Sequence, residues 1–115
     1  MAYETEDFSI NCISNTQSKI SGILRLPTPK EYEEVLKDIS DDLSAAADAG
    51  KIYTIDITEL SFLNSSGITS FARLILLARS KKSTLVFKGK ESIPWQKKSI
   101  LSLTKLWEKL EIQLT

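Results

Sequence analysis

Four small polar residues, Asn-Ser-Ser-Gly at positions 64–67, interrupt an otherwise apolar stretch and are the best candidates for chemistry in this chain. Apolar residues dominate positions 52–63 before them and 68–77 after them. The first run is typical of a strand and the second of a helix, so the polar residues are expected at the start of the helix. A helix N-terminus has unpaired N–H groups and the positive end of the helix dipole, and both favour an anion. The sequence therefore predicts a charge-dependent switch at this turn.

The two serines of the turn allow two interpretations. Serine is common at helix starts, where its hydroxyl serves only as a cap for a backbone N–H group. Alternatively, Ser65 or Ser66 is a docking contact or an acceptor of a modification. Asn64 is expected to be the N-terminal cap of the helix in either case.

The first half of the chain predicts a hairpin followed by a helix. Apolar and polar residues alternate over residues 8–13 and again over residues 20–26, as in two antiparallel strands. The Pro-Thr-Pro sequence at 27–29 ends the second strand, because proline cannot donate to a strand ladder. Residues 30–50 then show the apolar spacing of an amphipathic helix, with Gly50 as its stop.

The second half alternates strands and helices. A strand at 52–57 is apolar at nearly every position, which is typical of a strand covered on both faces. After the helix that ends near Ser80, we expect a short strand at 84–87, a helix that begins at Pro94 and a short strand at 111–114. The order β-β-α-β-α-β-α-β predicts a single α/β domain with a mixed central sheet and helices packed against it.

Length and composition indicate the number of domains and the cellular location. The 115 residues are enough for one core. Residues 1–6 are expected to be a flexible acidic terminus without a secretion signal, and no apolar run approaches the roughly 20 residues of a membrane span. Cys12 is the single cysteine, which fits a reducing cytoplasm, and we expect it to be a small buried side chain.

No enzymatic activity is expected. The chain has no histidine, which excludes histidine-based catalysis and the common zinc sites. It also has no glycine-rich phosphate loop and no nucleophile elbow. Asp56 lies in the strand before the turn, and we interpret it as structural. Trp107 shares an apolar helix face and is expected in the core, whereas Trp95 is either a core residue or a partner anchor.

Charge is unevenly distributed although the net charge is zero. Residues 1–50 contain ten acidic and four basic residues, a balance of −6, and residues 51–115 contain five acidic and eleven basic residues, a balance of +6. This asymmetry indicates either an interaction surface or helix faces that are merely solvated. The lysines lack interleaved aromatic residues, so nucleic acid is not an expected partner.

The turn and its context resemble a known family. An apolar strand, the sequence Phe-Leu-Asn-Ser-Ser-Gly-Ile at 62–68 and an apolar helix ending at Arg79 are similar to the signature of the STAS domain of anti-sigma-factor antagonists. The resemblance covers nearly the whole order of elements. It implies a bacterial cytoplasmic protein without cofactor or metal, which acts in transcription regulation by partner switching.

The resemblance also implies roles for individual residues. Ser65 would be the phosphoacceptor, and Asn64, Ser66 and Gly67 would complete the docking turn, with Gly67 permitting close approach by a partner. The implied partners are a serine kinase of the histidine-kinase-like ATPase class, often itself an anti-sigma factor, and a PP2C-type phosphatase. Two positions depart from the family pattern, because Asn64 replaces its usual aspartate and Thr69 its frequent second glycine.

A second function is compatible with the same resemblance. A stand-alone STAS subunit of a membrane transporter or signalling assembly would bind an ATPase component, and its serine would be a contact without being phosphorylated. Neither function requires insertion into a membrane. The expected strand edges would also permit a homodimer.

Overall fold

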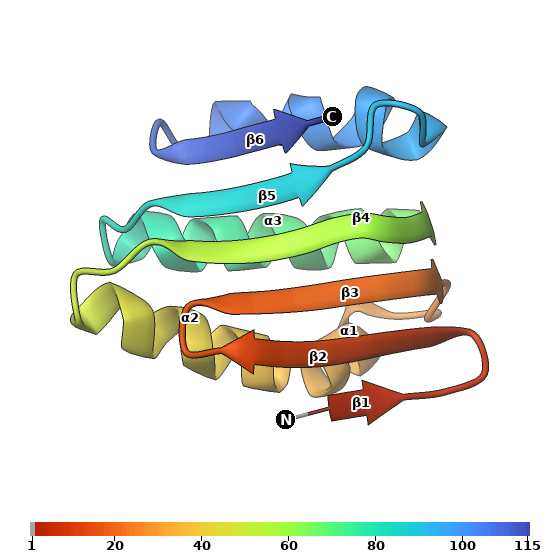
Figure 1. Ribbon diagram of the computed structural model, residues 1–115, viewed down its shortest axis with the longest axis horizontal. Coiled ribbons are helices and arrows are strands. Elements are labelled where there is room, and N and C mark those ends of the chain that lie inside the picture. Colours follow the sequence, from red (N-terminus) through yellow and green to blue (C-terminus); the bar gives the residue numbers. More distant parts are fainter. Residues whose placement is uncertain (1) are drawn as a thin grey trace.

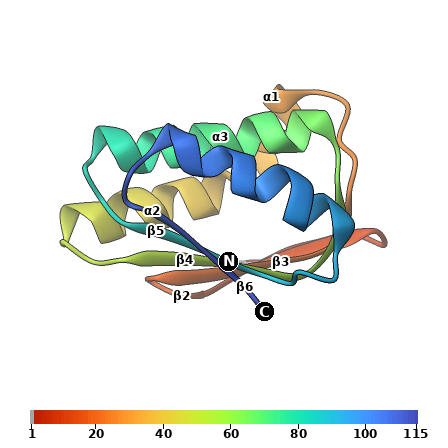
Figure 2. The same cartoon turned by 90° about the horizontal axis from the view of Figure 1, so that it is seen from above.

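A mixed six-stranded sheet is the framework of the protein, and all helices pack on one of its faces (Figures 1 and 2). The computed structural model describes residues 2–115. Strands follow one another across the sheet in chain order, from β1 at one edge to β6 at the other. The strands are β1 (Ala2–Glu4), β2 (Phe8–Ser14), β3 (Gln17–Leu24), β4 (Tyr53–Leu63), β5 (Leu85–Gly89) and β6 (Leu110–Leu114). The helical elements are α1 (Pro29–Val35), α2 (Lys37–Asp48), α3 (Ser65–Ser80), η1 (Gln96–Ile100) and η2 (Leu101–Leu106).

The predicted α/β class and mixed sheet are confirmed. Strands β1, β2 and β3 are antiparallel neighbours, which confirms the hairpin, and β3, β4, β5 and β6 are parallel neighbours. None of the helices in residues 2–115 combines the length and the apolar character needed to cross a membrane.

The N-terminus differs from the expected flexible segment. Ala2–Glu4 form strand β1, which pairs with Ser9, Ile10 and Asn11 of β2, while Met1 lies outside the described residues. The Tyr3 ring stacks on the ring of Phe8, with centroids 5.8 Å apart. Backbone pairing and this aromatic contact therefore hold the acidic segment against the sheet.

Two predicted helices differ in detail. The helix expected over 30–50 is divided at Leu36, whose backbone (φ −96°, ψ 4°) ends α1 and begins α2. Thr28 caps α1 by accepting a bond of 3.3 Å from the N–H of Glu31. The helix expected from Pro94 is irregular, because η1 is a π-helical turn and η2 is a 3-10 helix.

Strand β4 is covered on one face only, contrary to the expectation from its apolar sequence. Tyr53, Ile55 and Ile57 are fully buried beneath the helices. Thr54 and Asp56 alternate with them and are less buried. No helix covers the other face of the sheet (Figure 2). The period-two alternation of buried and less buried residues thus matches a sheet with one open side.

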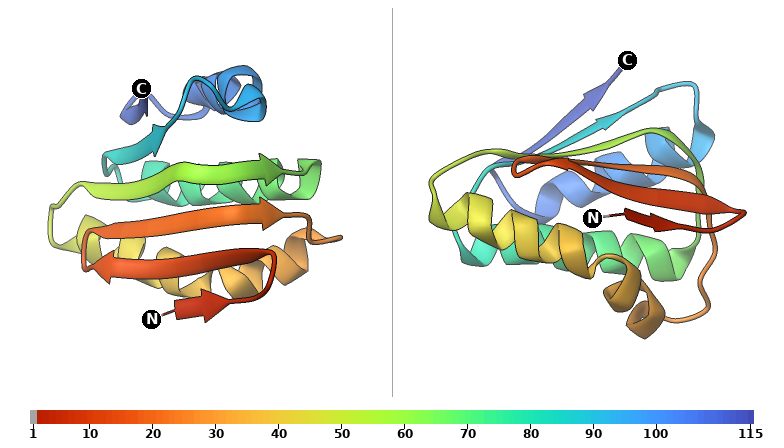
Figure 3. Two further views of the ribbon diagram at one scale, coloured as in Figure 1. Left: turned by 45° about the vertical axis from the view of Figure 1, so that its right-hand side comes forward. Right: turned by 60° about the horizontal axis from the view of Figure 1, so that its bottom comes forward.

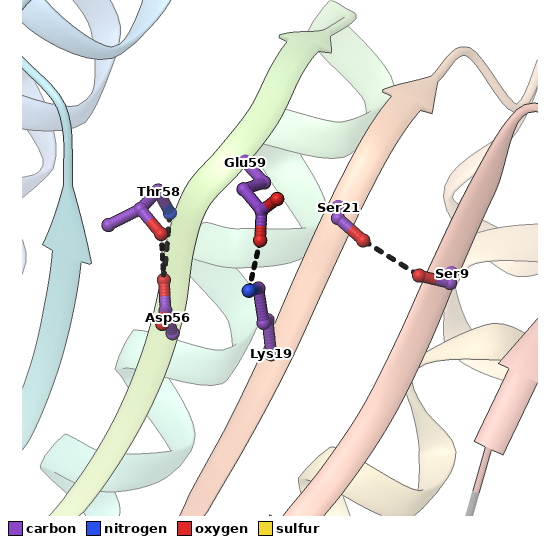
Figure 4. A network of polar contacts seen from close by, with 6 residues as sticks. All are labelled: Ser9, Lys19, Ser21, Asp56, Thr58 and Glu59. Carbon is purple, nitrogen blue, oxygen red and sulfur yellow. Dashed lines mark hydrogen bonds and ion pairs between the residues drawn. The ribbon is translucent and has the colours of Figure 1, made fainter.

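The second half of β4 carries two irregularities that shape the path to the candidate turn. Its register with β3 shifts between Lys19 and Ser21 and again between Gly22 and Ile23. At the first shift, Asp56 Oδ1 accepts bonds from the Thr58 N–H (2.9 Å) and the Thr58 hydroxyl (2.6 Å) (Figure 4). Asp56 thus binds a neighbouring residue of its own strand, as a structural residue would.

Strand β5 pairs with only the first part of β4, and a buried glutamine side chain forms hydrogen bonds with the next part. The register between the two strands ends at the pair Asp56–Lys88. Beyond it, the fully buried Gln96 donates from Nε2 to the carbonyls of Ile57 (2.6 Å) and Leu60 (3.0 Å). Its Oε1 accepts a bond of 2.8 Å from the N–H of Lys90. One side chain therefore holds the free edge of β4 just before the candidate turn.

Both tryptophans belong to the packed structure. Trp95 is partly buried, and its Nε1 donates to the Leu60 carbonyl at 2.9 Å. Trp107 is partly buried against the core, and its Nε1 donates to the Ser83 carbonyl at 2.8 Å. Trp107 was expected in the core, but its ring lies at the rim of the core and is only partly buried.

Candidate functional site

The Asn-Ser-Ser-Gly turn joins β4 to α3 at the carboxyl ends of the parallel strands β3 and β4 (Figure 1). Asn64 has an extended backbone (φ −82°, ψ 178°), and α3 begins at Ser65. Asn64 Oδ1 accepts a bond of 3.0 Å from the N–H of Gly67. The predicted N-terminal cap is therefore confirmed.

Asn64 does more than cap the helix, because its amide joins three segments. Its Oδ1 also accepts a bond of 2.6 Å from the hydroxyl of Tyr32 in α1. Its Nδ2 donates to the carbonyl of Leu26, which follows β3, at 2.9 Å. Burial raises the pKa of Tyr32, and its hydroxyl is the donor in this bond because an amide oxygen can only accept.

These contacts explain why an asparagine is suited to a position where the resembling family has aspartate. A carboxylate could accept the bonds from Gly67 and Tyr32, but it has no N–H to donate to Leu26. Its second oxygen would then face a carbonyl oxygen. Sequence reasoning identified the cap but missed Tyr32 and Leu26, and helical spacing around Tyr32 was the only available signal.

Gly67 is buried by the protein itself. A Cβ atom at this position would lie 2.6 Å from Leu63 Cγ and 2.8 Å from Tyr32 Oη. Both distances are too short for real contacts, so the glycine makes room for neighbours within the chain. The expectation that Gly67 lets a partner approach closely does not match this arrangement.

The two serines differ in their surroundings. Ser66 is half-buried, and its hydroxyl donates to the Pro27 carbonyl at 3.4 Å. Ser65 is exposed, and its hydroxyl takes part in none of the side-chain hydrogen bonds found among residues 2–115. Ser65 is therefore the serine of the turn that an external group can reach without breaking an internal bond.

Polar groups on the open face of the sheet are paired with one another. On the open face of the sheet, Lys19 forms an ion pair with Glu59, which raises the pKa of Lys19, and the Ser9 and Ser21 hydroxyls are 2.7 Å apart (Figure 4). Within the described part of the chain, no group of three or more histidine, cysteine or acidic residues could hold a metal ion. The chemistry available at the turn is that of an exposed hydroxyl beside the positive end of a helix.

A groove of about 340 Å³ lies on the helical side of the protein, but Ser65 is not part of it. Leu36 and Leu74 are in its lining, and ion pairs Arg73–Glu33 (3.1 Å) and Lys37–Asp41 (3.3 Å) lie at its charged positions. Its charged groups thus neutralise one another. The groove runs between α1–α2 and α3, whose arrangement Figure 3 shows from two further directions.

The lone thiol of Cys12 is protected against reaction, although it is only partly buried. Burial, followed by the hydrogen bond and the negative charge of the nearby Asp42 carboxylate, raises its pKa to about 11. At pH 8 the higher pKa lowers the thiolate fraction about 100-fold relative to an ordinary cysteine, and the greater nucleophilicity of a basic thiolate offsets about tenfold of this. We therefore expect native Cys12 to react with iodoacetamide about tenfold more slowly than the same chain unfolded in urea.

The matched variant for this measurement is Asp42→Asn. It removes the negative charge and should accelerate alkylation of the native protein. Equal rates for the native and unfolded chains would contradict the raised pKa.

No protein-family model matches the chain, and no curated protein is significantly similar to it. The resemblance to the STAS domain therefore depends on the order of elements and on the turn at 64–67.

Proposed function

We propose that this chain is a regulatory protein-binding module of the anti-sigma-factor-antagonist type. Its turn at 64–67 would be the docking surface, and Ser65 the phosphoacceptor. The observation that supports this proposal is the contrast within the turn. Asn64, Ser66 and Gly67 are engaged inside the protein, whereas the Ser65 hydroxyl is exposed and makes no internal bond among the described residues.

Phosphorylation at this position would leave the fold intact. A phosphoserine adds roughly −1.5 to −2 charges at pH 7. Ser65 is the first residue of α3, where a negative charge stabilises a helix by about 0.3–1 kcal/mol. A crystal structure of the phosphorylated protein with a rearranged core would contradict this mechanism.

The same charge would release a bound partner. Burying an unpaired dianion in an interface costs several kcal/mol, and each ~1.4 kcal/mol changes affinity tenfold. The partner in this proposal is an ATP-dependent serine kinase of the histidine-kinase-like class that also acts as an anti-sigma factor. A PP2C-type phosphatase would restore binding.

Ser65→Ala and Ser66→Ala form the matched pair that tests the proposal. We expect phosphate on Ser65 in protein purified from its native cells, detected by mass spectrometry, and its loss in Ser65→Ala but not in Ser66→Ala. Ser65 is exposed, so Ser65→Ala should change the free energy of unfolding by no more than about 0.5 kcal/mol. Phosphate on Ser66 instead of Ser65 would contradict the assignment.

A second outcome of the same experiment would favour the alternative function. If Ser65 carries no phosphate and a transporter ATPase component co-purifies with the protein, the chain is a subunit of a membrane-associated assembly. Co-purification of a histidine-kinase-like ATPase together with phosphate on Ser65 would support the switch.

A further inference from the structure

Two hydroxyl groups are buried in the core without a hydrogen-bond partner among residues 2–115. Ser18 of β3 and Tyr53 of β4 are both 0% exposed, and neither Ser18 Oγ nor Tyr53 Oη bonds to another group of the described chain. Buried polar groups in proteins are nearly always paired, either with the protein or with ordered water, because an unpaired group loses its hydration without compensation. Two such exceptions on neighbouring strands indicate a site for a bound molecule.

The two hydroxyls belong to one polar cluster between the sheet and α2. Ser18 is the direct register partner of Cys12 in β2 on one side and of Ile55 in β4 on the other. Tyr53 precedes Ile55 by two residues, so both side chains point to the buried face of β4. Burial raises the pKa of Tyr53, the nearby Ser18 hydroxyl lowers it, and the charge of Asp42 in α2 raises it. Because Asp42 also raises the pKa of Cys12, the four polar side chains lie close together.

The chemistry of this cluster favours water as the bound molecule. Both hydroxyls carry a proton that needs an acceptor, whereas the Asp42 carboxylate can only accept a proton from a donor. A water molecule accepts two bonds and donates two, so one molecule can bond to both hydroxyls and to the carboxylate. An anion would be repelled by Asp42, and a metal ion would find a single carboxylate as its charged ligand.

Asp42 connects the cluster to the solvent. Its side chain is half-buried and also lines a surface depression of about 150 Å³ between the β2–β3 turn and α2. Thr16 of the turn and Ala46 of α2 line the same depression. Solvent can therefore reach the cluster past the Asp42 side chain.

We propose that the hydroxyls of Ser18 and Tyr53 bind one buried water molecule, which also donates to the Asp42 carboxylate. The water links β3 and β4 to α2, where the side chains do not bond directly. Buried waters typically make about three hydrogen bonds and are part of the fold. The site lies at the end of the parallel strands opposite the turn at 64–67, so it does not depend on the proposed function.

A crystal structure in which ordered water is visible tests the site directly. We expect one water molecule within hydrogen-bond distance of Ser18 Oγ and Tyr53 Oη, with its third bond to an Asp42 carboxylate oxygen. A direct bond between the two hydroxyls, or the absence of water between them, would overturn the proposal. A water that bonds to both hydroxyls but not to Asp42 would overturn the link to α2.

Tyr53→Phe tests in solution whether the Tyr53 hydroxyl is bonded. If it bonds to water, its removal should raise the equilibrium constant of unfolding roughly threefold to tenfold, measured by urea unfolding. If it is unpaired, the variant removes a polar group that the interior disfavours, and the constant should stay the same or fall. That second result would overturn the proposal. Tyr3→Phe is the matched control, because Tyr3 is exposed and its variant should leave the constant unchanged.

A double variant tests whether the two hydroxyls share one water. Removal of either hydroxyl weakens the site for the shared molecule, so the second removal should have a smaller effect than it has alone. Ser18→Ala combined with Tyr53→Phe should therefore raise the unfolding constant by less than the product of the two single effects. Effects that multiply fully would overturn the shared water.

Discussion

Gln96→Ala is expected to lower the free energy of unfolding by about 3–5 kcal/mol, because it removes the partners of several buried groups at once. The Ile57 carbonyl and the Lys90 N–H would each lose the bond that Gln96 provides. The Leu60 carbonyl would keep its bond from Trp95. A loss of this size is a large fraction of the stability of a small domain.

Urea unfolding followed by circular dichroism measures this loss, with two comparison variants. Gln113→Ala removes an exposed glutamine of β6 and should change stability by no more than about 0.5 kcal/mol. Trp95→Phe removes one of the two donors to Leu60 and should cost less than Gln96→Ala. A Gln96→Ala variant as stable as Gln113→Ala would show that other groups hold the free edge of β4.

Asn64→Ala is expected to cost about 2–4 kcal/mol, the second largest effect. It removes the cap on Gly67 and leaves the Tyr32 hydroxyl and the Leu26 carbonyl without their partner. Asn64→Asp keeps the two bonds to Oδ1 and loses only the bond to Leu26, so it should cost about 1–2 kcal/mol. Asn11→Ala, on the exposed part of β2, is the control that should have little effect.

The Asn64→Asp variant also tests the function of position 64. We expect it to remain folded and to alter the rate of Ser65 phosphorylation by a cognate kinase, because it adds a negative charge beside the acceptor. An unchanged rate would mean that position 64 is only a cap and a link to α1. Equal stability of the alanine and aspartate variants would contradict the hydrogen-bond assignment at Asn64.

The elements with clear periodicity could be predicted from the sequence. Alternation identified the β2–β3 hairpin, helical spacing identified α3, and the residue type of Asn64 identified its cap. These features depend on neighbours within a few residues. The local sequence pattern is therefore sufficient to predict them.

Features that depend on distant segments could not be predicted. The bonds of Gln96 to Ile57 and Leu60 connect positions 39 and 36 residues apart. The bond between Tyr32 and Asn64 spans 32 residues. The register shift between Gly22 and Ile23 could not be predicted either, because it is defined only by the pairing of β3 with β4.

The candidate site could likewise be predicted only in part. Its hydroxyls could be located from residue type, and the resemblance already implied Ser65 as the acceptor. The structural difference between the two serines depends on the Pro27 carbonyl, which lies 39 positions from Ser66. The burial of Gly67 inside the protein could not be predicted either, and the resemblance implied instead that this glycine permits close approach by a partner. Of its neighbours, Leu63 is close in the sequence, whereas Tyr32 reaches Gly67 only through the packing of α1 against α3.

The sheet order has a consequence for how a partner arrives. Residues 2–50 build β1–β3 with α1 and α2, and residues 51–115 build β4–β6 with the other helical elements, so the charge balances of −6 and +6 lie on opposite sides of the molecule (Figure 1). The protein is thus an electric dipole directed across the strands. Such a field orients a charged partner before contact, and salt weakens it because the Debye length is only about 8 Å at physiological ionic strength. The β4–α3 turn lies at the boundary between the negative and the positive half. The field would therefore rotate the protein so that this turn faces an approaching partner whose own charge is unevenly distributed.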